Sequence, residues 1–402
     1  MSNTYYRDEP VSPSLDRAPA CPFDPAPEVT ALRAEQPIAR LAAPEGSPGV
    51  WLVTGYGLVR QILADPRFSS RYETHYYPQM GGYLPPAPAG DLTGMDAPQH
   101  TRFRKLLAGK FTVRRMNLLT ERVTEITRER LDAMERQGPP ADLVEVFAQP
   151  IPALMICELL GVPYEDREQF QTATRTLSDA VEPEAQYTAF IELGDYLRTL
   201  ALAKRANPTD DLLSDLATAG DLTDEELGGV AAFLLGAGLD TTANMLALGT
   251  FALLRDPAQL AALRDDPGLA AGAVEELLRH LSIAAMGMRG VLEDVELGDR
   301  QLKAGDTVII ALNAANRDPA KFSDPDVLDL RRSATGHLAF GHGVHQCLGQ
   351  QLARVEMRVA FPALLTRFPT LRLAVPAEEV PLRTDPSQIY GVRNLPVTWD
   401  RG

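Results

Sequence analysis

The stretch AFGHGVHQCLGQQLA, residues 339–353, sets one cysteine, Cys347, among glycines and near two histidines. A thiol in this setting can be a buried apolar group, a catalytic nucleophile, a zinc ligand or the ligand of a larger group. Zinc is disfavoured because no second cysteine lies nearby. A nucleophile is disfavoured because His345, two residues away, does not face the sulfur productively at that spacing.

The pattern favours a glycine-shaped loop that presents a thiolate just before a helix. Backbone N–H groups at the start of the segment LGQQLARVEMRVAFPALL would stabilise the negative charge on sulfur. A thiolate held in this way is a known axial ligand of haem iron.

A second chemical feature lies about a hundred residues upstream, in a long and nearly all-apolar predicted helix. Its middle reads Gly236-Ala237-Gly238-Leu239-Asp240-Thr241-Thr242. Each glycine weakens a helix by about 1 kcal/mol relative to alanine, and burying an acid is costly unless it is paired. One interpretation is a packing notch with Asp240 paired to a distant arginine. The other is a locally opened helix, where the acid and hydroxyl deliver protons to a ligand.

The elements that position these residues are mostly helical. The pattern predicts a strand at Gly49–Thr54, a helix from there to Pro66, and a long aperiodic segment at 70–94 that is typical of a binding loop. A helix ends at Gly138, with Met116, Leu119, Val123 and Ile126 on one face. Thr223 and Glu226 predict a capping box for the long helix, which ends before Pro257. Strands follow at Thr307–Leu312 and near the C-terminus. We therefore expect a mainly α protein with small β-sheets.

Composition bounds the class of protein. The 402 residues suffice for a large core with an enclosed cavity, and the net charge of −15 argues against a nucleic-acid binder. Three widely spaced cysteines do not suggest a disulfide framework. The first residues lack the apolar core of a signal peptide, and no long apolar run is free of polar residues. We expect a cytoplasmic monomer without a membrane span.

The motifs together resemble the cytochromes P-450. Phe340, Gly343, Cys347 and Gly349 match the family signature Phe-x-x-Gly-x-x-x-Cys-x-Gly. AGLDTT is similar to the oxygen-activating segment of the long central helix, and Glu276 with Arg279 to the Glu-x-x-Arg motif. ANRDPAKFSDPDVLDLRR resembles the meander that follows, with Arg332 as partner of that pair. The likeness spans the chain from about Cys21 to Trp399.

The resemblance implies one P-450 domain over 1–402, with an irregular arm at 1–28 and haem b buried between the long helix and the helix after the cysteine. Cys347 is the implied iron ligand, and Asp240 and Thr241 are the implied acid–alcohol pair that delivers protons for activation of O2. The other implied haem contacts are His100, Arg104, Ala237, Arg289, Phe340, Gly343, His345 and Gly349. Arginine and histidine suit the two haem carboxylates because they form charge-assisted hydrogen bonds. His342 receives no role.

The implied reaction inserts one oxygen atom into a mid-sized lipophilic molecule, as hydroxylation or epoxidation in specialised metabolism. Oxidative coupling, desaturation and a non-catalytic haem sensor are the alternatives. Electrons would come from a separate ferredoxin and its reductase, because the chain has no nucleotide or flavin segment. The basic run Arg102–Arg115 has six Lys or Arg and no acid, and is either a solvated face or a docking patch for an acidic ferredoxin.

The substrate pocket can be placed only by position. Its candidate residues are mostly apolar: Phe233, Ala237, Ile283, Ala284, Met286, Ile389 and Tyr390. Two departures from the family pattern stand out. RHLSIAAMGMR lacks the proline that often follows Glu-x-x-Arg, and Leu328 replaces a usual phenylalanine.

Overall fold

The computed structural model describes residues 9–17, 21–78, 80–110, 113–166, 170, 172–173, 183–383 and 389–401, without the side chains of 113, 114, 116–118, 183–187 and 190. The chain forms two compact units. Unit 1 contains 1–87, 93–100 and 275–347, and unit 2 contains 88–92, 101–274 and 348–402.

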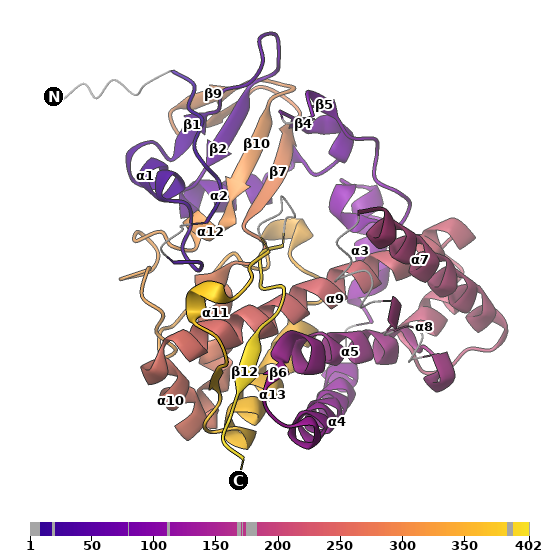
Figure 1. Cartoon of the computed structure of the whole chain (residues 1–402). Coiled ribbons are helices and arrows are strands. Elements are labelled where there is room, and N and C mark those ends of the chain that lie inside the picture. The colour runs from indigo at the N-terminus through magenta and orange to yellow at the C-terminus, as the bar shows by residue number, and fades with distance from the viewer. Residues whose placement is uncertain are drawn as a thin grey trace. The chain divides into compact units, whose positions relative to one another are not determined.

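Unit 1 is built on a five-stranded sheet with the order β1-β2-β10-β7-β3 (Figure 1). Strands β2 and β10 are parallel, and the other neighbours are antiparallel. The strands are β1 (Ile38–Arg40), β2 (Val50–Val53), β3 (Phe68–Ser69), β7 (Met286–Val291) and β10 (Thr307–Ala311). Two hairpins add β4 (Tyr76–Tyr77) with β5 (Gly82–Tyr83), and β8 (Val295–Leu297) with β9 (Arg300–Leu302).

Strand β10 is buried at every residue because both of its faces are covered. Val308 and Ile310 belong to one apolar cluster together with residues of α2 (Tyr56–Ala64). Ile309 and Ala311 belong to a second cluster with Val29 of α1 (Pro27–Glu35). This division follows from the alternation of side chains along a strand. The short helices α12 (Leu312–Ala315), η1 (Tyr72–Thr74) and η6 (Gly343–His345) complete the unit.

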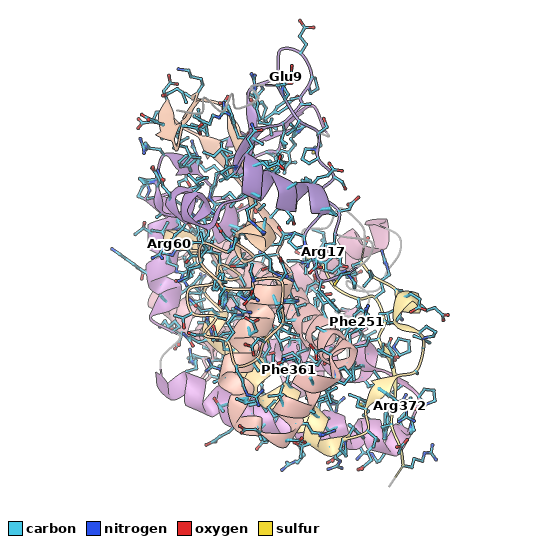
Figure 2. The ribbon with its side chains drawn as sticks, turned by 90° about the vertical axis from the view of Figure 1, so that its left-hand side faces the viewer. Glu9, Arg17, Arg60, Phe251, Phe361 and Arg372 are labelled. Atoms are coloured by element: carbon cyan, nitrogen blue, oxygen red, sulfur yellow. The ribbon has the colours of Figure 1, made fainter. Side chains whose placement is uncertain are left out.

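Unit 2 is helical around α9 (Asp224–Arg255), which packs against α5, α7 and α13. Phe251 of α9 and Phe361 of α13 lie buried among these helices (Figure 2). A Cβ at Gly249 would lie 2.6 Å from Phe361 Cζ, so glycine allows the two helices to approach closely. The helices of the unit are α4 (Val113–Gln137), α5 (Pro150–Leu160), α7 (Pro183–Ala206), α8 (Leu212–Ala219), α9, α10 (Pro257–Asp265) and α13 (Gln350–Arg367), with η3 (Val144–Ala148), η4 (Tyr164–Asp166), η5 (Pro267–Leu269) and η7 (Ala377–Glu379).

A small sheet, β11-β12-β6, joins β11 (Arg372–Leu373), β12 (Pro396–Thr398) and β6 (Ala141–Asp142) in unit 2. Two helices and one short turn cross from one unit to the other: α3 (Gln99–Ala108), α11 (Ala270–Leu281) and η2 (Leu92–Gly94).

Most predicted elements are confirmed with small shifts. The predicted strand at 49–54 is β2, and the long helix has the expected capping box of Thr223 and Glu226. Leu119, Val123 and Ile126 are buried as predicted, and the Met116 side chain lies outside the described residues. Leu312 begins a helix rather than ending a strand. Segment 70–94 is more ordered than expected because it contains the β4–β5 hairpin. Helix α1 begins at Pro27, inside the predicted arm.

Of the helices that the structure describes, α9 has the length and apolar composition of a membrane span. However, 61% of its most apolar window is buried inside the protein, where α9 is the central helix of unit 2.

Candidate active site

The loop before Cys347 takes its shape from two glycines. Gly341 and Gly343 have φ of 70° and 73°, the left-handed region that favours glycine. A Cβ at Gly343 would lie 2.4 Å from the carbonyl oxygen of Leu63 in α2, so this loop also packs tightly on the helix. The Cys347 N–H donates to the Phe340 carbonyl at 2.9 Å, which closes the loop.

Gly349 adopts a backbone conformation that does not require glycine. Its φ is −81°, which any residue adopts, and a Cβ there would meet no described atom within 4 Å. Gly349 is the N-cap residue of α13, which begins at Gln350. Helix N-termini carry partial positive charge, and this charge favours the thiolate form of a cysteine that precedes the helix. The three cysteines of the chain form no disulfide with one another.

Two of the predicted carboxylate-binding residues meet in unit 1. The rings of His100 and His345 lie with their centroids 4.0 Å apart and their planes tilted by 41°. His100 is buried and His345 is half-buried. His100 lies on α3, and Arg104 follows it by four residues on the same helix, so the two share a helix face.

Arg289, on β7, is half-buried and donates to the neighbouring Met288 carbonyl at 2.6 Å. Burial lowers the pKa of Arg289, and the more distant charge of Asp96 only partly offsets this effect. No carboxylate of the described residues forms an ion pair with it. A half-buried guanidinium whose positive charge has no neighbouring carboxylate among the described residues is suited to binding an anionic group.

His342 contacts α2. Arg60, an exposed residue of α2 (Figure 2), donates from Nε to His342 Nε2 at 3.2 Å. Partial burial and the charge of Arg60 lower the pKa of His342 from its ordinary value.

Helix α9 continues without a break through the Gly236–Thr242 segment, so the expectation of a locally opened helix is wrong. Close packing compensates for the glycines: a Cβ at Gly238 would lie 2.9 Å from Ile156 Cδ1 of α5. Thr241 Oγ1 donates to the Ala237 carbonyl at 2.8 Å, one helical turn back. Such a bond satisfies the hydroxyl inside the helix.

Most of α9 is buried, but one stripe in its middle is open. Ala237 is exposed, and Phe233 and Thr241 are half-buried. Their spacing of four residues places them on one face of the helix. An apolar stripe with a single hydroxyl can line a site for an apolar ligand.

Asp240 is held by an ion pair, as the packing interpretation expects. Arg383 Nη1 lies 2.7 Å from Asp240 Oδ1, and Asn244 Nδ2 donates to the same oxygen at 3.0 Å. Asn244 also donates to the Asp240 carbonyl at 2.9 Å. A Cβ at Gly391 would lie 1.7 Å from Asn244 Oδ1, so glycine is required at 391 for this arrangement.

The predicted Glu276–Arg279–Arg332 cluster is confirmed. Arg279 Nε lies 2.7 Å from Glu276 Oε2, and Arg332 Nε lies 3.1 Å from Glu276 Oε1. Glu276 and Arg279 are fully buried. Arg279 also donates to the carbonyls of Asn316 and Pro325, so the cluster joins α11 to the segment after α12.

The predicted pocket residues differ in their surroundings. Phe233 and Ala237 lie on the open stripe of α9, and Ala284, Ile389 and Tyr390 are half-buried. Ile283 is buried. Met286 packs against the apolar cluster on the α1 side of the sheet, so it serves the core at least in part.

Part of the basic run is neutralised within unit 2. Arg102 pairs with Glu226, with Nη1 and Oε1 2.5 Å apart, and Arg115 pairs with Asp215 at 3.0 Å. Lys110 lies 3.9 Å from Asp215. Lys105 is exposed and forms no ion pair with a described residue.

Sequence reasoning did not identify Arg383 or Asn244. Asn244 follows Asp240 by one helical turn, a spacing that would have indicated the contact. Arg383 is 143 residues away in sequence, and no local pattern marks it.

These residues fit a haem. A single loop-held thiol can supply the iron ligand, and Arg289 with the two histidines suits carboxylate groups. The open apolar stripe with Thr241 suits a reacting apolar molecule.

Comparisons with known proteins agree with this chemistry. The sequence model of the family described as Cytochrome P450 matches residues 269–396. Cytochrome P450 105C1 from a Streptomyces species is 52% identical over 380 residues, which are 94% of this chain and 96% of that protein. Pentalenic acid synthase of Streptomyces avermitilis is 44% identical over 396 residues, covering 97% of this chain and 98% of that protein. The crystal structure of CYP105P1 in complex with filipin I has a TM-score of 0.89 and 43% identity, covering 98% of this chain and all of that one.

Proposed function

The chain belongs to the cytochrome P450 family and is a monooxygenase that uses haem b and O2, and from this we propose a role for each residue of the site. Haem b, when bound, supplies activation of O2 at its iron. Cys347 is the proposed iron ligand, because it stands in the signature loop and precedes the N-terminus of α13. This placement is the observation that carries the proposal.

The remaining residues bind and orient the haem. Arg289, His100, His345 and Arg104 hold its two carboxylates, and the uncompensated charge of Arg289 supports this role. Phe340 and Gly343 shape the loop, and Gly349 caps α13 beside the thiolate. Ala237 leaves open space on α9.

Asp240 and Thr241 are the proposed proton relay. Thr241 donates its proton to the Ala237 carbonyl, so its oxygen remains an acceptor and must release that bond before it donates elsewhere. Asp240 is adjacent and holds a carboxylate that can resupply the proton.

The proposed substrate is a mid-sized lipophilic molecule of specialised metabolism. The apolar stripe of Phe233 and Ala237 supports an apolar ligand. The relatives point the same way, since one is a pentalenic acid synthase and another was solved with filipin I. Ile283, Ala284, Ile389 and Tyr390 remain proposed pocket residues, together with the exposed side of Met286.

A ferredoxin and a ferredoxin reductase are the proposed electron donors. We propose that the protein is a cytoplasmic monomer, as its acidic composition suggests.

The test of Cys347 is spectroscopic. The reduced wild-type protein under carbon monoxide is expected to show the long-wavelength Soret band of thiolate ligation, and Cys347→Ser is expected to lose it. Cys21→Ser is the matched control, because this thiol lies in the N-terminal segment, and its band should persist. Retention of the band in Cys347→Ser would refute the assignment.

The reaction class is tested with labelled dioxygen. A ligand that shifts the Soret band is incubated with the enzyme, the donor proteins and labelled dioxygen, and the mass of the product is measured by mass spectrometry. One labelled oxygen atom in the product is expected for oxygenation. Product without label would favour coupling or desaturation.

A further inference from the structure

A cleft of about 350 Å³, lined by both polar and apolar side chains, lies entirely within unit 2 on one side of α9. Its walls come from α9, from η3 beside β6, and from the segment before β12. Its lining includes exposed Glu145 and Arg393 and buried Asn244, together with Asp240 and Arg383. This volume can hold several water molecules, and the charged and amide side chains in its lining can form hydrogen bonds with them.

The two oxygens of Asp240 have different surroundings. Oδ1 accepts from both Arg383 and Asn244, at 2.7 Å and 3.0 Å. Oδ2 accepts no hydrogen bond from a described residue. The Asp240 side chain is 30% exposed and that of Arg383 is 18% exposed, so water reaches the pair. Oδ1 therefore anchors the carboxylate, and Oδ2 is available to a proton.

Asp240 also lies between two faces of α9. Asp240, Ala243, Asn244 and Ala247 border the cleft, whereas Phe233, Ala237 and Thr241 form the open stripe. Successive helix residues are about 100° apart around the axis, so Asp240 is at the edge of the cleft face that adjoins Thr241.

We propose that this cleft supplies protons to Asp240 and that Arg383 is a positioning residue for that transfer. A proton passes from solvent through cleft water to Asp240 Oδ2, and leaves Oδ2 toward Thr241 Oγ1, which restores the carboxylate. Arg383 keeps Oδ1 fixed and Oδ2 directed to water throughout. The inference rests on the proton relay proposed above for Asp240 and Thr241.

The first test needs no turnover. High-resolution diffraction from the haem-containing enzyme is expected to show ordered water in the cleft, with one molecule within hydrogen-bond distance of Asp240 Oδ2. A cleft filled by side chains, or an Oδ2 with no water, would overturn the proposal whatever the variants do.

The second test compares Arg383→Gln, Arg383→Lys and the cleft control Arg393→Gln. Arg383→Gln is expected to lower product formed per electron by about two- to fivefold, the effect of a partly exposed ion pair, with hydrogen peroxide making up the difference. Its solvent deuterium isotope effect should rise, while substrate affinity from the Soret shift stays unchanged. If Arg383 had only a structural role, its substitution would instead lower substrate affinity and haem content.

Arg383→Lys is expected to restore most of the coupling, and Arg393→Gln should match the wild type. Wild-type coupling in Arg383→Gln, or an equal loss in Arg393→Gln, would refute the role of Arg383. Asp240→Asn separates the two levels. If Asp240→Asn is fully coupled, the proposed proton relay is refuted. If Asp240→Asn is uncoupled while Arg383→Gln remains coupled, only the role of Arg383 and the cleft is refuted.

Discussion

The fold strongly perturbs the ionisation of Glu356. It lies in α13, is 3% exposed, and its Oε2 atom has no hydrogen-bond partner. Burial raises the pKa of Glu356 from 4.5 to about 8, because the charged form is not solvated there. At neutral pH the folded protein therefore keeps this carboxyl protonated.

Stability should fall as pH rises across that interval. Between about pH 4.5 and 8 the folded chain binds a proton that the unfolded chain has lost, so alkali favours unfolding until both forms are ionised. Glu356→Gln removes the titration and is expected to flatten this dependence. The check is the free energy of unfolding by denaturant at several pH values.

Glu378→Gln is the control for that measurement, because Glu378 is exposed and should leave the slope unchanged. Equal slopes in the wild type and Glu356→Gln would contradict the argument.

Single residues differ in how much the sequence reveals about them. Cys347 and Asp240 stand out because short motifs surround them, and a thiol among glycines or an acid in an apolar helix is unusual. Arg383 and Glu356 do not stand out. The ion pair of Arg383 depends on a segment distant in sequence, and the burial of Glu356 depends on which helices cover α13.

At the scale of elements, the buried Glu276–Arg279–Arg332 cluster fixes the C-terminal end of α11. Glu276→Gln leaves two guanidinium groups without the carboxylate that they share. Removing one member of a buried ion pair costs about 3–5 kcal/mol, because the remaining charges are not solvated. We expect a loss of that order in the free energy of unfolding.

The neighbouring substitution Glu275→Gln is the matched control. Glu275 Oε2 lies 3.1 Å from His337 Nε2, and a glutamine amide at 275 can keep this hydrogen bond. We expect a cost below about 1 kcal/mol, because Glu275→Gln leaves no buried guanidinium without its carboxylate. Similar losses in both variants would show that burial does not set the cost.

The ends of helices can be predicted from nearby residues, whereas the tertiary packing around a helix cannot. The capping box at Thr223 and the position of Pro257 mark the ends of α9 in the sequence. The two glycines in its middle predict weakness, yet α9 continues because Ile156 occupies the space beside Gly238. Tertiary packing of this kind overrides helix propensity.

At the scale of the molecule, the chain crosses between its two units five times, after Ala87, Leu92, His100, Val274 and Cys347. Two of these crossings fall inside α3 and α11, so unfolding of one unit would also unfold part of a helix that belongs to the other. We therefore propose that 1–402 unfolds as one cooperative domain. Calorimetry of the haem-containing enzyme should give one transition with equal calorimetric and van't Hoff enthalpies. Two resolved transitions would mean two domains.

The charge of the whole molecule bears on electron transfer. With a net charge of −15, the protein repels an acidic ferredoxin unless a local basic group offsets it. Arg102, Lys110 and Arg115 form internal ion pairs, whereas Lys105 is an exposed member of the run that forms none with a described residue. Lys105→Glu is expected to raise the KM for ferredoxin and leave kcat unchanged.

Lys303→Glu makes the same charge change directly after β9 in unit 1, where Lys303 pairs with Asp294, and should leave that KM near the wild-type value. An equal rise in both variants would indicate that net charge, and not a patch, governs the encounter.

The close approach of Gly391 to Asn244 has a practical consequence for directed evolution. Residues 389 and 390 are attractive positions for a mutant library that seeks new substrates, and such libraries often randomise whole segments. Any side chain at 391 would displace the Asn244 amide and, through it, the carboxylate that Asn244 holds. A clone with a substitution at 391 would be inactive because proton delivery fails, but a screen would read it as unable to bind its substrate. A library across this turn should therefore keep position 391 as glycine.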